Sequence, residues 1–117
     1  MREARYNEHL MTSSHALVLT TVASLEDARE IAASVLDKRL AAGAQMLSIN
    51  SLYSWKGARR DETEVLLVFI TREDLYRALE SAIVSVHKYE TPELVLLPVG
   101  MGLPAYLNWI DEVTDPT

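Results

Sequence analysis

The order of its strand-like and helix-like segments constrains the fold of this chain more than any other feature of the sequence. Four runs of apolar and β-branched residues are predicted to be strands, at residues 16–22, 44–55, 64–70 and 93–99. Three stretches repeat apolar residues with a helical period, at residues 28–40, 75–86 and 104–113. The pattern therefore predicts strand, helix, strand, strand, helix, strand and a last helix.

This order is typical of the split βαβ, or ferredoxin-like, arrangement, which is an α+β fold. It predicts a four-stranded antiparallel sheet with two helices on one face and a C-terminal helix added. Residues 44–55 and 64–70 are expected to form a long hairpin around a turn at residues 56–61. In this topology the second and fourth strands lie at the two edges of the sheet.

Short signals predict where the helices begin and end. Ser24 precedes Asp27 by three residues, and Thr71 precedes Asp74 by three, a spacing typical of a helix N-cap. Gly43 follows the last apolar residue of the first stripe, where a left-handed residue often ends a helix. We therefore expect caps at Ser24, Thr71 and Gly43.

The strand predicted at residues 44–55 is long, carries no charged residue and contains no proline. Natural sheets usually protect such an edge with lysine, proline or a bulge, because an open edge pairs with other chains. An edge about 40 Å long is therefore expected to be covered, and so is the sheet face without helices. Self-association would cover both, and the alternative is a C-terminal segment that folds back over the edge.

Composition narrows the classes of function. The 117 residues, 49% of them hydrophobic, suit one domain over residues 15–117 behind a flexible tail at residues 1–14. The absence of cysteine excludes disulfides, thiolate metal sites and cysteine nucleophiles, and it fits a cytoplasmic protein. A net charge of -6 disfavours nucleic acid and anionic membranes as partners. No apolar run is long enough to span a bilayer.

Residues 87–93 read His-Lys-Tyr-Glu-Thr-Pro-Glu and join the second predicted helix to the last strand. An imidazole, a phenol and two carboxylates come together here, so a chemical site is expected at this joint. His87, with Glu90 or Glu93 nearby, is a candidate ligand for Cu2+, zinc or another divalent cation. The alternative is an ordinary histidine at a helix C-terminus, favoured by hydrogen bonding and by the helix dipole.

Aromatic residues of the hairpin indicate a second kind of site, for a small molecule. Tyr53, Trp55, Tyr89 and Glu90 would cluster beside His87 if the hairpin crosses to the same joint of a neighbouring subunit. Clefts with apolar walls and a few polar groups often bind ligands, although aromatic residues are also enriched at interfaces for packing alone. We predict no enzyme and no catalytic residues, because neither a Ser-His-Asp constellation nor a phosphate-binding glycine loop is indicated.

Several short segments follow one another in a specific order. They are Lys38-Arg39-Leu40-Ala41-Ala42, Ser51-Leu52-Tyr53-Ser54-Trp55-Lys56-Gly57, Tyr89-Glu90, Pro92-Glu93, Leu97-Pro98-Val99 and Tyr106-Leu107-x-Trp109. In this order and spacing the chain resembles the CutA divalent-cation-tolerance family, over about residues 16–114. The resemblance implies a ferredoxin-like homotrimer whose hairpins reach across subunits, and an association with tolerance to copper and other divalent ions. It implies no established catalytic activity.

The chain departs from copper-binding members of that family at several positions. These are Thr20 and Gly43 where the family has cysteine, Val86 where it has histidine, Lys88 where it has proline, and Ala58 and Ile70 where it has lysine. Of the three copper-ligand positions that the resemblance implies, only His87 is kept.

The leading hypothesis is thus a cytoplasmic, non-enzymatic homotrimer linked to divalent metal ions, with His87 as the metal ligand. An alternative is a metal-independent trimeric sensor that binds a small molecule at Tyr53, Trp55, Tyr89 and Glu90. A third hypothesis is a purely structural scaffold.

Overall fold

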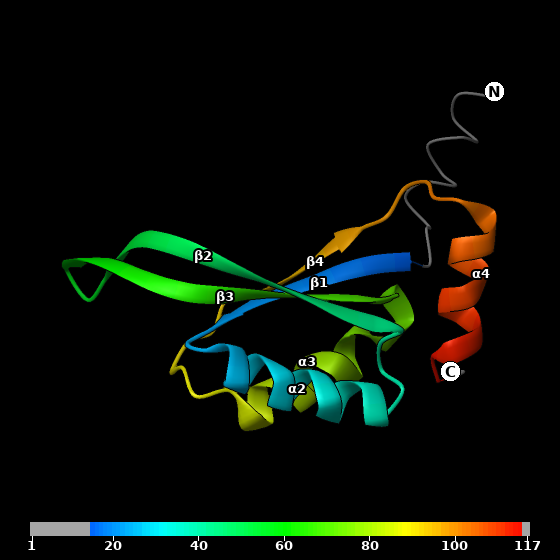
Figure 1. The fold of residues 1–117 in the computed structure, drawn as a ribbon, viewed down its shortest axis with the longest axis horizontal. Helices are drawn as coiled ribbons and strands as arrows, with labels where there is room; N and C mark the ends of the chain where they lie inside the picture. Colours follow the sequence, from blue (N-terminus) through cyan, green and yellow to red (C-terminus); the bar gives the residue numbers. More distant parts are fainter. Residues whose placement is uncertain (1–14, 116–117) are drawn as a thin grey trace.

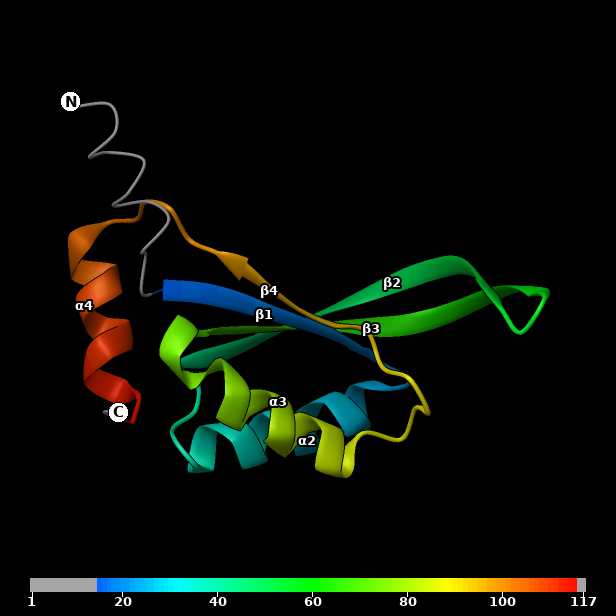
Figure 2. The same cartoon turned by 180° about the vertical axis from the view of Figure 1, so that it is seen from behind.

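A computed structural model describes residues 15–115, and the tail predicted at residues 1–14 lies outside them. The elements are β1 (His15–Val22), α2 (Leu25–Asp37), β2 (Gly43–Trp55), β3 (Ala58–Arg72), the short 3-10 helix η1 (Glu73–Leu75), α3 (Tyr76–Val86), β4 (Leu94–Pro98) and α4 (Pro104–Val113). The strands pair antiparallel in the order β2-β3-β1-β4, which confirms the predicted α+β class and both edge strands. Helices α2 and α3 cover one face, and α4 stands beside one end of the sheet (Figures 1 and 2).

The core lies between the sheet and the two covering helices. Side chains of a strand alternate between faces, and Val18 of β1 lies opposite Phe69 of β3, so both point to the helices. The apolar stripes of α2 and α3 close the other side of this layer. The largest fully buried side chains of the cluster are Phe69, Leu67, Leu75, Leu79 and Ile83.

Helix α2 begins as predicted but ends differently. The Oγ of Ser24 accepts the backbone N–H of Asp27 at 3.1 Å, which confirms the N-cap. The left-handed residue after the helix is Arg39, with a φ of 58°, whereas Gly43 already opens β2. The left-handed conformation strains the backbone of a residue other than glycine. Long-range hydrogen bonds offset this strain, because the Arg39 guanidinium donates to three carbonyls at the end of α4, those of Glu112, Val113 and Thr114.

The cap predicted at Thr71 is wrong. Strand β3 continues to Arg72, which pairs with His15 of β1, and η1 then leads into α3 without a side-chain cap. The Thr71 hydroxyl instead donates to the carbonyl of Leu40 at 2.7 Å. The Thr71 hydroxyl, which the spacing to Asp74 predicts as a helix cap, is thus engaged in a tertiary hydrogen bond.

The β2–β3 hairpin is longer than predicted. Its turn is only Lys56 and Gly57, both with positive φ, at 50° and 81°, as in the two-residue turns that match the twist of paired strands. Residues 58–61, predicted to belong to the turn, pair with residues 52–55 and extend β3. Their charges are tolerated because this part of the hairpin projects beyond the helices (Figure 1).

The face of the sheet opposite α2 and α3 is rich in exposed apolar side chains. On that face they are Leu47 of β2 and Val95 and Leu97 of β4. The segment that includes α4, at one end of the sheet, exposes four more apolar side chains: Met101, Leu103, Tyr106 and Trp109. A surface of this kind usually marks contact with another molecule. Within residues 15–115, no helix has the length and apolar character that a membrane span requires.

Candidate functional site

The joint between α3 and β4 is fixed by His87. Its backbone N–H closes the last turn of α3 on the Ile83 carbonyl, at 2.9 Å. Its Nδ1 accepts the N–H of Tyr89 at 3.1 Å, so the ring proton lies on Nε2, which donates to the Thr21 carbonyl at 2.9 Å. Both ring nitrogens therefore have partners within the protein, in the arrangement of a neutral imidazole.

The position that matches a family cysteine, Thr20, lies against the same imidazole. Its Oγ1 is 3.2 Å from Nε2 of His87. The fold therefore brings together two of the three positions that the resemblance implies for copper ligands, although Thr20 offers a hydroxyl where the family has a thiol. Val86, at the third position, is 51% exposed at the end of α3. In the described part of the chain, no group of three or more His, Asp and Glu residues could hold a metal ion. His87 as a metal ligand stays a prediction, and a metal would have to displace one of its hydrogen bonds.

A groove of about 650 Å³ lies between the hairpin and the segment after α3. It forms where the pairing of β3 with β1 stops at Val65, so that residues 58–64 pair with β2 alone among the described strands. All four predicted ligand-binding residues line it: Tyr53, Trp55, Tyr89 and Glu90. They meet within one chain, whereas the sequence suggested a meeting across two subunits. Their role in binding stays a prediction.

Carboxylates hold the two tyrosines of the groove. Glu64 is only 5% exposed and accepts a hydrogen bond from the Tyr89 hydroxyl at 2.7 Å. Burial and then this hydrogen bond raise the pKa of Tyr89 above its usual 10.0. Tyr53 donates to Glu62 in the same way, and that hydrogen bond raises the pKa of Tyr53. Each phenol is therefore a neutral donor aimed at a carboxylate.

Glu62 and Glu64 are functional candidates that the sequence pattern does not single out, because Glu64 simply begins the strand predicted at residues 64–70. The register places Glu62 opposite Ser51 and Glu64 opposite Ile49, on the same face of the hairpin as Tyr53. One sequence signal could have indicated them: Glu64 directly precedes an apolar strand run, and Glu62, two residues earlier, points to the same face.

Cations near the hairpin turn are paired with groove residues. The Nζ of Lys56 lies 3.2 Å from the Glu90 carboxylate and 5.5 Å from the centre of the Trp55 ring. Arg60 lies 3.5 Å from Glu62. An aromatic ring and a carboxylate thus already hold one ammonium group beside the groove.

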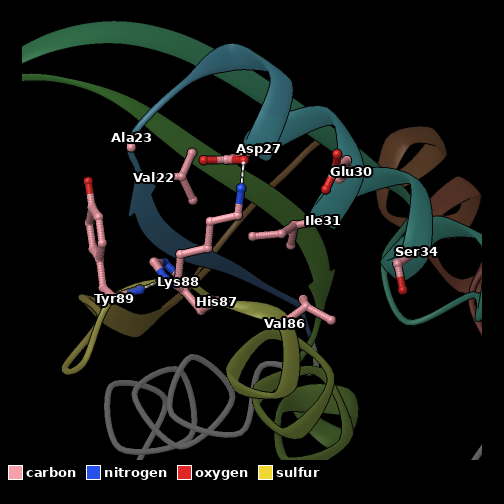
Figure 3. Close-up of a pocket in the computed structure, with 10 residues that line it drawn as sticks. All are labelled: Val22, Ala23, Asp27, Glu30, Ile31, Ser34, Val86, His87, Lys88 and Tyr89. Atoms are coloured by element: carbon pink, nitrogen blue, oxygen red, sulfur yellow. Dashed lines mark hydrogen bonds and ion pairs between the residues drawn. The ribbon is translucent and has the colours of Figure 1, made fainter.

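A smaller cavity of about 180 Å³ lies between α2 and the segment after α3. Figure 3 shows the Lys88 side chain crossing it to Asp27, and the Nζ of Lys88 donates to the Asp27 carboxylate at 2.7 Å. This hydrogen bond lowers the pKa of Asp27 below its usual value. His87 and Tyr89 line the cavity as well, so the predicted joint borders both hollows.

Comparison with known proteins gives the relatives of the chain. Residues 16–113 match the sequence model of the family described as CutA1 divalent ion tolerance protein. Protein CutA of Mus musculus is 44% identical over 89 residues, which are 75% of this chain and 50% of that protein. The chain thus spans about half the length of the mouse protein, as it does for Bos taurus and Homo sapiens. The divalent-cation tolerance protein CutA of Archaeoglobus fulgidus is 33% identical over 101 residues, 86% of this chain and 99% of that protein.

Solved structures agree with these relatives. CutA1 from Oryza sativa has a TM-score of 0.86 at 33% identity and covers 91% of this chain and 98% of its own. The divalent cation tolerance protein from Thermus thermophilus has a TM-score of 0.83 at 35% identity and covers 86% of this chain and 99% of its own. Because the sequence match and the fold extend over nearly all described residues, the chain belongs to the CutA1 divalent ion tolerance family.

Proposed function

We propose that this chain forms a homotrimer that binds a ligand without catalysing a reaction and contributes to divalent-cation tolerance. The role in tolerance follows the names of its relatives from Archaeoglobus fulgidus and Thermus thermophilus. The observation that carries the binding role is the hairpin groove, where aromatic rings and carboxylates of separate elements converge. A cytoplasmic location is part of the proposal, since a chain without cysteine suits a reducing compartment.

Two features of the surface support self-association. Strand β2 is an edge strand of 13 residues without a charged side chain. The sheet face opposite α2 and α3 exposes Leu47, Val95 and Leu97, which a lone chain would leave in water. Open edges and apolar faces of this kind are normally covered by another chain. The number three comes from the family resemblance.

A divalent cation is the ligand that the family description favours, with copper among the candidates and His87 as its proposed contact. His87 borders the small cavity whose wall also carries Asp27 and Glu30. With one imidazole and oxygen donors, the site suits weak binding of a divalent ion better than tight binding of copper(I), which prefers sulfur.

The hairpin groove favours a second candidate function, that of a metal-independent sensor of small molecules. Its volume of about 650 Å³ lies in the range of ligand pockets, and Tyr53, Trp55, Tyr89 and Glu90 combine apolar walls with polar groups. A purely structural scaffold would bind neither class of ligand.

Light scattering at micromolar concentration tests the assembly, and three chain masses are expected. Calorimetric titration with Cu2+ and Zn2+ tests the metal site. His87→Ala should lose the binding heat, whereas His15→Ala, at the start of β1, should keep it. A stable monomer would reject the homotrimer, and an unchanged isotherm in His87→Ala would reject that histidine as a ligand.

A further inference from the structure

We propose that the hairpin groove binds an organic ammonium ion, a primary amine or diamine, with its charged group at Glu64 and its carbon chain against Trp55 and Tyr53. This assignment rests on the proposed function of the chain as a binding protein and adds the chemical class of the ligand.

The groove carries negative charge that the described residues do not neutralise. The cations that line the groove, Arg60 and Lys88, and Lys56 beside it are already engaged in ion pairs at 2.7 to 3.5 Å. The pairs are Arg60 with Glu62, Lys56 with Glu90, and Lys88 with Asp27, of which Asp27 lies outside the groove. Glu64 and Glu93 are thus left without a cationic partner within residues 15–115. A positively charged ligand would complement them.

Glu64 is the stronger attraction of the two, because it is 5% exposed. Within the described residues its carboxylate accepts one side-chain hydrogen bond, from the neutral hydroxyl of Tyr89 at 2.7 Å. A carboxylate has room for several donors, and burying it without a cation costs free energy. Its charge also contributes to the raised pKa of Tyr89 and Tyr53, which places both phenols within its electrostatic reach. An ammonium group would supply both donors and charge.

The chain itself already holds an ammonium group beside the groove. The Nζ of Lys56 lies 5.5 Å from the centre of the Trp55 ring and 3.2 Å from the Glu90 carboxylate. A cation over an indole face, with a carboxylate beside it, is a common way in which proteins recognise organic amines. The Lys56 side chain is 68% exposed at the hairpin turn, so a ligand amine can displace it. Lys56 therefore competes with the second ammonium group of a diamine whose first ammonium group lies at Glu64.

The shape of the site favours an organic cation over a bare metal ion. Divalent metals need several oxygen or nitrogen ligands converging on one point, and no such cluster of three is present in the part of the chain that the structure describes. The groove instead offers about 650 Å³ and three aromatic side chains, Tyr53, Trp55 and Tyr89. Aromatic faces suit an alkyl chain and its ammonium end.

Titration calorimetry of the full chain, as it assembles in solution, tests this ligand class with butylamine, putrescine and the neutral isostere butanol. We expect binding of both amines and none of butanol. Glu64→Gln keeps an oxygen acceptor for Tyr89 but removes the charge, so butylamine affinity should fall by about tenfold or more. Glu112→Gln makes the same change of charge on α4, at the other end of the molecule, and should leave binding unchanged (Figure 1).

Lys56→Ala should act in the opposite direction. Removal of the competing ammonium is expected to tighten putrescine binding by about two- to fivefold, the scale of an exposed cation–π contact, because the second ammonium group of putrescine can then lie beside Trp55 and Glu90. Trp55→Leu leaves every charge in place and should weaken butylamine binding. This variant provides a test that does not depend on the folding of Glu64→Gln. Circular dichroism checks the fold of each variant.

Equal binding of butylamine and butanol overturns the assignment, and so does unchanged butylamine affinity in both Glu64→Gln and Trp55→Leu. If neither amine binds while the chain is a trimer that binds a divalent cation, the ligand class is wrong and the proposed function stands. If the chain is a monomer and binds no divalent cation, the proposed function fails even where the amines bind.

Discussion

Among single residues, His87 is hydrogen-bonded at both ring nitrogens, and the hydroxyl of Thr20 lies 3.2 Å from its Nε2. A sulfur ligand is what copper(I) prefers, and this position carries none. Thr20→Cys is therefore expected to raise copper(I) affinity above that of the wild type. Competition with a colorimetric copper(I) chelator measures the gain. Thr21→Cys, on the opposite face of β1, is the matched control, and equal affinity in the two variants would contradict a copper site at His87.

The Tyr89–Glu64 contact is expected to stabilise the fold. Tyr89→Phe leaves a buried carboxylate without its donor and should lower the free energy of unfolding by about 1 to 3 kcal/mol. The folded-state pKa of Tyr89 is raised above 10.0, so its contribution is fully present below pH 10.0 and is lost as pH rises through the folded value. In urea unfolding, the free energy of unfolding of Tyr89→Phe should therefore be lower than that of the wild type, and this difference should shrink at alkaline pH. Tyr106→Phe, at an exposed position on α4, should show no such difference, and an equal loss there would refute the contact.

At the scale of elements, the two-residue turn sets the length of the hairpin. Gly57 has a φ of 81°, and a Cβ added there would have nothing within 4 Å, so the cost of Gly57→Ala is backbone strain alone. We expect a loss of about 1 to 2 kcal/mol in unfolding free energy. Gly43→Ala is the control, because its φ is not positive and its Cβ would make ordinary contacts with Ile70 and Trp109 at 3.6 and 3.8 Å. Similar losses in thermal unfolding of both variants would argue against strain as the cause.

At the scale of the whole molecule, the proposed trimer depends on the open face of the sheet. Leu47→Glu and Leu97→Glu should shift the mass in sedimentation velocity toward the monomer, because a buried interface would have to take up an unpaired charge. Circular dichroism should show that the fold is kept. Val84→Glu is the matched control, since Val84 is 53% exposed on α3, on the other side of the sheet. Trimers that survive both leucine substitutions would place the interface elsewhere.

The order of elements, the Ser24 cap and the joint at His87 follow from local sequence patterns, because periodicity and capping depend on residues close along the chain. The sequence also singles out four of the side chains that line the groove, but not the reason they meet.

Other features depend on contacts between residues far apart along the chain, which no local pattern predicts. Arg39 takes the left-handed conformation expected at Gly43 because its side chain bonds to the end of α4. Glu64 becomes a groove residue because Tyr89, far along the chain, donates to it. Both outcomes follow from strand register and packing, which place residues side by side that no local pattern connects.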